Sequence, residues 1–400
     1  MKRRFISEGH LIDSGILGKI LNLIIAEGGD YEIVEFVIGK TNVSVSRLEI
    51  DLICDTEEQL SRITEKLIQQ GSYEARVPES VTVPAPADGV APDEFYSTTN
   101  HRTEVYSGGT WQEVADQRMD AVVVMNPGDL RCKKLRDIKK GDRILVSSES
   151  IRVHPPERER KSDIFSFMTN NVSSERAVDV TVSRIAEELE TLKREGEKVI
   201  AVAGPVVVHT GGSEAFASIL REGYIHGLLS GNALAVHDLE YQLFGTSLGI
   251  ELSTGKTHNE GHRNHMRTIN RINSFGSIAG AVHAGEVTGG IMYELTRNNI
   301  PYCLAGSIRD DGPLPETEMD LVAAQDRYAE IIKGASMVLM LSSMLHSIGT
   351  GNMLPSWVKT VCVDINPAVV TKLMDRGSGQ TIGIVSDVGL FLRVLSQNLF

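Results

Sequence analysis

Two apolar runs near the C-terminal end of the chain are followed by glycines and by a carboxylate. Residues 338–341 form the first run, and residues 349–355 after it read Gly-Thr-Gly-Asn-Met-Leu-Pro. The second run, residues 361–363, ends at Asp364. The backbone N–H groups of glycines approach a phosphate closely, and a carboxylate at the end of the next strand accepts from ribose hydroxyls. The pattern predicts a glycine-containing loop that binds the adenosine and pyrophosphate of a dinucleotide.

The match to the usual dinucleotide fingerprint is incomplete. Leu354 stands where a third glycine is expected, and Asp364 follows sooner than the usual spacing of about 20 residues. A tight loop between two buried strands would have the same composition, so this alternative stays open. If a dinucleotide is bound, Asp364 favours NAD over NADP, because a 2′-phosphate would face its negative charge.

Strand-like apolar runs alternate with helical patterns through the C-terminal half of the chain. Strands are expected at residues 199–203, 225–229, 300–305, 337–341, 359–364 and 381–385, and helices at residues 213–221, 286–297, 320–333, 367–374 and 387–395. This alternation predicts an α/β fold with a doubly wound, mostly parallel sheet, whose strand ends meet at one edge. The residues expected to contact the dinucleotide at that edge are Asn232, Ala233, Asp310, Gly349, Thr350, Gly351, Asn352, Met353, Leu354, Pro355, Asp364, Ile365, Asn366, Asp387 and Val388.

Three domains are expected. Residues 1–83 predict a small α+β module for assembly or regulation, with a helix at 11–25, strands at 31–38 and 43–54 joined by a turn at 39–42, and a helix at 60–70 that Thr56 begins. Residues 84–155 predict a small, mainly β module. A linker rich in proline and charge, at residues 155–161, leads into the large domain of residues 156–400.

The composition of the chain limits which partners and which cellular compartment are expected. The net charge is −13, with carboxylates along the whole length, which argues against a nucleic-acid partner. No apolar window approaches the length of a membrane-spanning helix, and the N-terminus lacks the apolar core of a signal peptide. The four cysteines are far apart and form no Cys-x-x-Cys pair. We expect a cytoplasmic protein that forms homo-oligomers and takes a small-molecule substrate.

Two polar segments have both a structural and a functional interpretation. Residues 97–102 read Ser-Thr-Thr-Asn-His-Arg, which is dense enough for a site but is also typical of a capped loop. His258, His262 and His265, with Glu260, have a spacing that would place three imidazoles on one helical face and could hold zinc. Gly261 weakens that helix and no fourth ligand is apparent, so no metal site is expected.

The segments 231–233, 309–313 and 349–355, taken together, resemble the archaeal-type ornithine cyclodeaminases. That family includes the C-terminal part of the cyanobacterial bifunctional arginine dihydrolase/ornithine cyclodeaminases and contains a region like lysine-oxoglutarate reductase/saccharopine dehydrogenase. The resemblance covers essentially the whole chain. At the level of the fold, the large domain is further similar to the NAD-binding domain of deoxyhypusine synthase. The resemblance implies tightly held NAD and the conversion of L-ornithine to L-proline and ammonia.

The implied reaction requires particular side chains. Hydride leaves the carbon that bears the α-amine, the δ-amine attacks the resulting imine, ammonia departs, and the hydride returns to the cyclic imine. A cation for the substrate carboxylate is expected at Arg102 or Arg309. Carboxylates for the amines and for proton transfer are expected at Asp310, Asp311 and Glu286, with His283 behind them.

Other interpretations remain open from the sequence. Residues 309–311 are also compatible with a turn whose polar groups bond one another. The chain as a whole is compatible with a net NAD-dependent oxidoreductase acting on lysine or saccharopine. It is also compatible with a binding protein that senses NAD or an amino acid through its N-terminal module.

Overall fold

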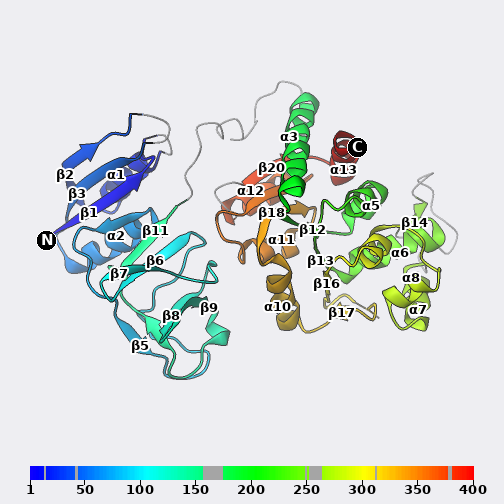
Figure 1. The fold of residues 1–400 in the computed structure, drawn as a ribbon, viewed down its shortest axis with the longest axis horizontal. Helices are drawn as coiled ribbons and strands as arrows, with labels where there is room; N and C mark the ends of the chain where they lie inside the picture. Colours follow the sequence, from blue (N-terminus) through cyan, green and yellow to red (C-terminus); the bar gives the residue numbers. More distant parts are fainter. Residues whose placement is uncertain are drawn as a thin grey trace. The chain divides into compact units, whose positions relative to one another are not determined.

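The computed structural model of the protein describes residues 1–12, 15–40, 44–155, 174–247, 250–251, 264–310, 313–376 and 381–400 (Figure 1). The chain forms two compact units. The first unit contains Met1–Ser166 and Asn352–Trp357, and the second contains Phe167–Gly351 and Val358–Phe400. The short return of the chain to the first unit at Asn352–Trp357 was not expected from the sequence. The finer division into domains 1–83, 84–155 and 156–400 stays a prediction.

The N-terminal part of the first unit is a four-stranded antiparallel sheet with two helices. The strands are β1 (Lys2–Gly9), β2 (Asp30–Val37), β3 (Ser46–Ile53) and β4 (Ser72–Glu74), in the order β2-β3-β1-β4. Helices α1 (Ile16–Ala26) and α2 (Glu57–Gln69) contribute Ile20 and Ile63 to a core that also contains Phe5. The expected cap of α2 is confirmed, because the Thr56 hydroxyl accepts from the N–H of Gln59 at 3.2 Å.

Two expectations for this region need correction. Strand β1, which pairs with both β3 and β4, was not expected. Helix α1 begins at Ile16 and not at residue 11, because Gly15 before it has φ +69°, outside the helical region. The expected turn at residues 39–42 lies partly outside the described residues, which resume at residue 44.

The rest of the first unit is built from short antiparallel strands, as expected for a mainly β module. One sheet has the order β5-β10-β8-β9, with β5 (Thr82–Pro84), β8 (Val122–Asn126), β9 (Asp129–Lys133) and β10 (Arg143–Leu145). The other has the order β11-β6-β7, with β6 (Arg102–Ser107), β7 (Thr110–Glu113) and β11 (Ile151–His154). A single 3-10 turn, Leu135–Asp137, follows β9.

The second unit is organised around a seven-stranded sheet in which every described pair is parallel. Its order is β17-β16-β13-β12-β18-β19-β20. The strands are β12 (Lys198–Ala203), β13 (Leu228–Gly231), β16 (Tyr302–Ala305), β17 (Thr317–Glu318), β18 (Ala335–Leu341), β19 (Lys359–Asp364) and β20 (Thr381–Val385). Without the edge strand β17, this is the strand order 3-2-1-4-5-6 of doubly wound dinucleotide-binding sheets. The expected doubly wound fold is confirmed.

Helices cover the sheet and bury its apolar strands. The core contains side chains from α3 (Ser174–Glu195), α5 (Ser213–Arg221), α6 (Asn232–Phe244), α9 (Ile291–Arg297) and α13 (Val388–Leu399). Helices α10 (Leu321–Ile332), α11 (Met344–Gly351) and α12 (Pro367–Arg376) pack in sequence against one another and connect the strands from β17 to β20. The remaining elements are α4 (Val206–His209), β14 (Thr246–Ser247), β15 (Ile250–Glu251), α7 (Asn264–Ser274) and α8 (Ile278–His283).

Most expected element bounds in this unit agree with the structure. The strands at 359–364 and 381–385 and the helix at 213–221 are confirmed. The strand expected at 225–229 instead spans Leu228–Gly231. The helix expected from residue 286 begins at Ile291, because Gly290 before it has φ +92°. Within the described ranges, no helix combines the length and the apolar character that crossing a membrane requires.

Candidate functional site

The sheet of the second unit has a topological switch point, where its connections change direction. The chain leaves β12 towards β13 on one side and leaves β18 towards β19 on the other. The two strand ends approach so closely that a Cβ on Gly204 would lie 2.2 Å from the carbonyl oxygen of Ser342. Ser342 itself has φ +46°, in the left-handed region that is unusual for a residue with a side chain. Ligands of doubly wound sheets bind at such a switch point, outside the carboxyl ends of the strands.

A glycine-containing loop was expected after β18. This expectation is wrong for residues 344–351, which form helix α11. Within a helix, the N–H groups of Gly349 and Gly351 point to carbonyls four residues earlier and not to a phosphate. A Cβ added at Gly349 would meet nothing within 4 Å, so no close neighbour requires a glycine there. The N–H groups at the start of α11, directly after the end of β18, are the ones positioned for an anion.

The other expected residues of this segment belong to different surroundings. Thr350 is fully buried in α11, and its hydroxyl has no hydrogen-bond partner among the described residues. Asn352, Met353, Leu354 and Pro355 lie in the part of the chain that returns to the first unit. There, the N–H of Ser356 donates to the carbonyl of Asn100 at 2.8 Å. Their expected contact with the dinucleotide stays a prediction.

Asn232 and Asp310, expected at the same sheet edge, are brought together by the structure. The Asn232 amide donates to Asp310 Oδ1 at 3.2 Å and accepts from the N–H of Leu314 and the hydroxyl of Thr317. Asp310 Oδ2 accepts from the N–H of Ser307 at 2.6 Å. The end of β13 is thereby joined to the loop after β16, and Ala233, at the start of α6, is exposed beside it.

A carboxylate ends β19, and another follows β20 by two residues. Asp364 Oδ1 accepts from the N–H of Asn366 at 2.8 Å, and Asn366 in turn accepts from the first turn of α12. Ile365 between them is 70% exposed. Asp387 caps α13 by accepting from the N–H of Leu390, and Val388 is buried behind it. Asp364 is therefore held at the end of the strand beside β18. A carboxylate that accepts from the ribose hydroxyls is expected at this place.

His346 on α11 was not singled out from the sequence. Its Nδ1 lies 3.0 Å from the hydroxyl of Tyr328, and that hydroxyl donates to the carbonyl of Ser230 at 2.6 Å. Since a phenol has one proton, Tyr328 accepts from Nδ1–H, and Nε2 is left without a proton. A Cβ on Gly231 would lie 2.9 Å from this Nε2, so the nitrogen faces the end of β13. Burial lowers the pKa of His346, which favours the neutral base.

A second buried polar cluster, which the sequence also did not reveal, lies between α4, α6 and β14. The rings of His209 and His237 are 4.7 Å apart, and His237 Nδ1 lies 3.0 Å from the carboxylate of Glu240. That carboxylate is fully buried and accepts from the hydroxyl of Thr246. Burial and the neighbouring His237 lower the pKa of His209 to about 4. The cluster places two imidazoles beside one buried carboxylate.

Several expected catalytic residues lie in other settings. Arg309 is exposed in the turn that Asp310 closes, and its N–H donates to the Ser307 hydroxyl. The sequence also allowed a turn whose polar groups bond one another. This alternative is correct for the hydrogen bonds that Ser307, Arg309 and Asp310 form. Asp311 lies outside the described residues. Glu286 forms a two-fold hydrogen-bonded ion pair with Arg271, at 2.8 and 3.0 Å, which lowers the pKa of Glu286.

Arg102 belongs to the first unit, where it pairs with Glu113 at 2.9 Å. The polar run before it is a hydrogen-bonded loop, in which the Thr98 hydroxyl donates to the carbonyl of Arg118. Of the histidine cluster, residues 258, 260 and 262 lie outside the described ranges, and His265 lies in α7. Among the side chains that the structure describes, no group of three or more His, Cys, Asp or Glu residues is arranged to hold a metal.

Comparison with known proteins places this chain in a family. Residues 183–395 match the model "Arginine dihydrolase ArgZ-like, C-terminal, Rossmann fold", residues 102–182 match its "first region", and residues 3–101 match the "LOR/SDH bifunctional enzyme conserved region". A relative from Methanocaldococcus jannaschii named ornithine cyclodeaminase is 48% identical over 98% of this chain and 94% of its own length. The chain belongs to the archaeal-type ornithine cyclodeaminase family.

Members of this family include longer proteins. The bifunctional arginine dihydrolase/ornithine cyclodeaminase ArgZ from Synechocystis is 48% identical over 98% of this chain, which spans 57% of its length. The apo structure of ArgZ superimposes with a TM-score of 0.87 at 45% identity, over all of this chain and 58% of ArgZ. The ternary complex of AgrE with ornithine and NAD⁺ has a TM-score of 0.55 at 46% identity, over all of this chain and 57% of AgrE.

Proposed function

We propose that this protein is an ornithine cyclodeaminase, which converts L-ornithine to L-proline and ammonia with bound NAD. The observation that supports this most strongly is the 46–48% identity, over 98% of the chain, to relatives of that name. The structure of AgrE, 46% identical to this chain, was solved with ornithine and NAD⁺. The doubly wound sheet of the second unit has the topological switch point at which such cofactors bind.

The residues around the switch point fit a dinucleotide. Helix α11 begins directly after β18 at the switch point, where its N–H groups would hold a pyrophosphate. Asp364 would accept from ribose hydroxyls, and its charge disfavours a 2′-phosphate. At the other end, Ala233 and the Asn232–Asp310 pair would border the half of the cofactor that reacts. NAD supplies the hydride acceptor and, at the end of the cycle, the hydride.

The protein must remove a proton from the substrate amine before hydride can leave the α-carbon. We assign this step to His346 Nε2, because its other nitrogen is held by Tyr328 and burial keeps the ring neutral. Asp310 would hold a cationic amine of ornithine, and Arg309 in the same turn would pair with the substrate carboxylate. Glu286, already paired with Arg271, is assigned no role in the reaction.

A second candidate is a net NAD-dependent oxidoreductase acting on lysine or saccharopine. The match of residues 3–101 to the LOR/SDH conserved region favours it, although this match covers only the N-terminal part of the chain. The two reactions differ in their cofactor balance. A cyclodeaminase returns the hydride to the product, whereas a net oxidoreductase accumulates NADH.

The decisive experiment incubates purified protein with L-ornithine, first without added cofactor and then with NAD. We expect proline and ammonia in equal amounts, with no net change in absorbance at the nicotinamide band. NADH accumulating with turnover of lysine or saccharopine would favour the second candidate, and no product from ornithine even with NAD would contradict the proposal. Asp310→Ala should lose turnover, while Glu330→Ala, which removes an exposed carboxylate from α10, should retain it.

We further propose that the protein works in the reducing cytoplasm as a homo-oligomer. The four cysteines, Cys54, Cys132, Cys303 and Cys362, are all free and buried, which suits a compartment in which thiols stay reduced. Light scattering after gel filtration measures the mass of the particle. A monomer at the protein concentration of the activity assay would contradict the proposed homo-oligomer.

A further inference from the structure

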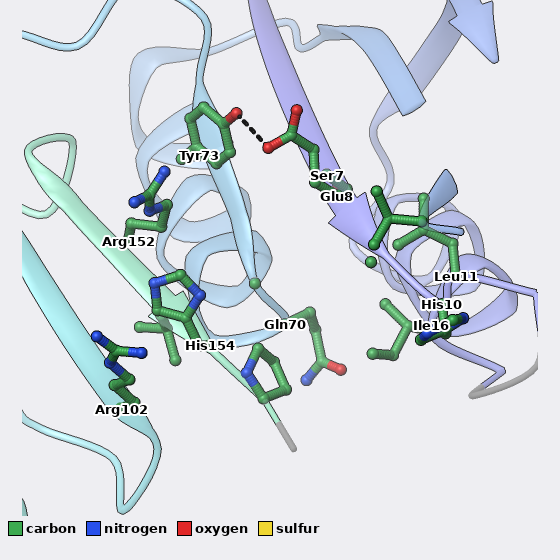
Figure 2. Close-up of a pocket in the computed structure, with 15 residues that line it drawn as sticks. Ser7, Glu8, His10, Leu11, Ile16, Gln70, Tyr73, Arg102, Arg152 and His154 are labelled. Atoms are coloured by element: carbon green, nitrogen blue, oxygen red, sulfur yellow. Dashed lines mark hydrogen bonds between the residues drawn. The ribbon is translucent and has the colours of Figure 1, made fainter. Parts of the chain in front are cut away.

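The first unit contains a cavity of about 440 Å³ whose wall carries charges of both signs (Figure 2). All its lining residues lie between Ser7 and Pro155 and therefore belong to the first unit. Cavities that bind small molecules have volumes of about 300–1,000 Å³, lined by a few well-placed polar groups. The site described in the second unit uses none of these residues. Arg102 was expected from the sequence to bind the substrate carboxylate, but it lies in the first unit.

One wall of the cavity carries three basic side chains, each paired with a carboxylate: Arg102 with Glu113, and Arg152 and His154 with Glu104. Strands β6 and β11 pair antiparallel, with His154 opposite Arg102 and Arg152 opposite Glu104. Since alternate residues of a strand face the same side, Arg102, Arg152 and His154 project from one face of this sheet. Figure 2 shows the three side chains in a row along the cavity.

The Arg152 guanidinium is held in place before any ligand arrives. Its Nε and Nη2 both donate to one oxygen of Glu104, at 2.9 and 2.6 Å. The guanidinium also lies over the rings of Trp111 and Tyr73, at 4.7 and 5.7 Å from their centroids. Glu104 engages Nε and Nη2 and not Nη1. A cation fixed in this way binds a carboxylate with little loss of side-chain entropy.

An anionic group lies across the cavity. Glu8, near the end of β1, accepts from the Tyr73 hydroxyl at 3.1 Å and pairs with Arg47 at 3.2 Å. The amide of Gln70 also lines the cavity (Figure 2). A simple anion such as phosphate would meet the carboxylate of Glu8, and a simple amine would meet two guanidinium groups. A ligand with a carboxylate and an ammonium group satisfies both walls.

We propose that this cavity binds a free α-amino acid. The carboxylate of the amino acid pairs with Arg102 and Arg152, and its ammonium group pairs with Glu8. The site consists of first-unit residues only, so its binding does not depend on the assignment of the reaction to the second unit.

The test is isothermal titration of the full-length protein, without NAD, with L-arginine, L-ornithine and L-proline. Acetate, putrescine and inorganic phosphate serve as ligands that carry one kind of charge. We expect saturable binding of at least one amino acid, and no comparable binding of the single-charge ligands. Arg102→Gln and Glu8→Gln should each weaken this binding by about 10- to 100-fold, the effect of losing one charge-assisted contact.

Matched variants separate this site from other effects. Arg131→Gln and Glu32→Gln remove exposed ion-paired charges elsewhere in the first unit and should leave the affinity unchanged. Asp310→Ala, in the second unit, should leave the affinity for L-arginine, which is not the substrate, unchanged, while abolishing turnover of L-ornithine if the proposed reaction is right. Thermal unfolding of each variant, with Glu8→Asp as a conservative replacement, checks that the fold is retained. Absence of amino-acid binding, equal binding of phosphate or acetate, or loss of binding in Asp310→Ala alone would each overturn the proposal.

Discussion

Replacing Gly349 by alanine distinguishes a helix from a phosphate-binding loop at this position. In the structure, Gly349 lies in the last part of α11, and an added Cβ would have no neighbour within 4 Å. Alanine stabilises a helix interior by about 0.5–1 kcal/mol relative to glycine, partly because it lowers the entropy of the unfolded chain. We therefore expect Gly349→Ala to raise the free energy of unfolding by about 0.5–1 kcal/mol, without loss of NAD affinity.

The measurement combines chemical denaturation with calorimetric titration of NAD. Gly204→Ala is the matched comparison at the same switch point, because its Cβ would lie 2.2 Å from the backbone oxygen of Ser342. Overpacking of this kind costs about 1–3 kcal/mol, and the displaced strand end should also weaken NAD binding. If Gly349→Ala instead weakened NAD binding without stabilising the protein, the phosphates would approach Gly349, and our placement of the anion at the start of α11 would be refuted.

Three further perturbations test other parts of the structure. Asp364→Ala should weaken NAD binding by about 10- to 100-fold in the same titration, and an unchanged affinity would show that the ribose lies elsewhere. His346→Gln should lower kcat by about 100- to 10,000-fold while NAD still binds. Because burial lowers the pKa of His346 below 6.5, the wild-type pH–rate profile should fall only below that pH, and a retained acidic limb in the variant would exclude His346 as its origin. Hydrogen bonds from Arg4 lower the pKa of Asp51 from 3.8 to about 2, so its contribution to stability is present above pH 3.8 and is lost as the pH falls towards 2. Denaturation curves should therefore show Asp51→Asn to be less stable than the wild type at pH 6 and nearly equal to it near pH 2.

The sequence predicted the large domain well because its strands are buried on both faces. Such strands read as uninterrupted apolar runs, as at β19 and β20, and their bounds agree with the structure. Strand β1 was missed because its first residues, Lys2, Arg3 and Arg4, are charged. In the folded unit these side chains pair with carboxylates of neighbouring elements, among them Asp51, so the charge does not prevent a strand.

The candidate site was predicted where it depends on strand ends and missed where it depends on contacts between distant residues. Asn232 and Asp310 were expected at one edge, and their side chains meet there. The tautomer of His346, which leaves Nε2 without a proton, depends on Tyr328, which no spacing or motif connects to it. Conversely, Glu286 looked available in the sequence, and only the structure shows its pairing with Arg271.

The return of Asn352–Trp357 to the first unit has a consequence for synthesis on the ribosome. The first unit is complete only when residue 357 has emerged, although its other segment ends at residue 166. At about 5–20 residues per second, translation of the intervening chain takes about 10–40 s. During that interval the carbonyl of Asn100 lacks the N–H of Ser356, its partner in the finished fold. The first unit is therefore expected to mature after most of the second has been made, and a fragment that stops at residue 166 should be less stable than the same unit in the whole chain.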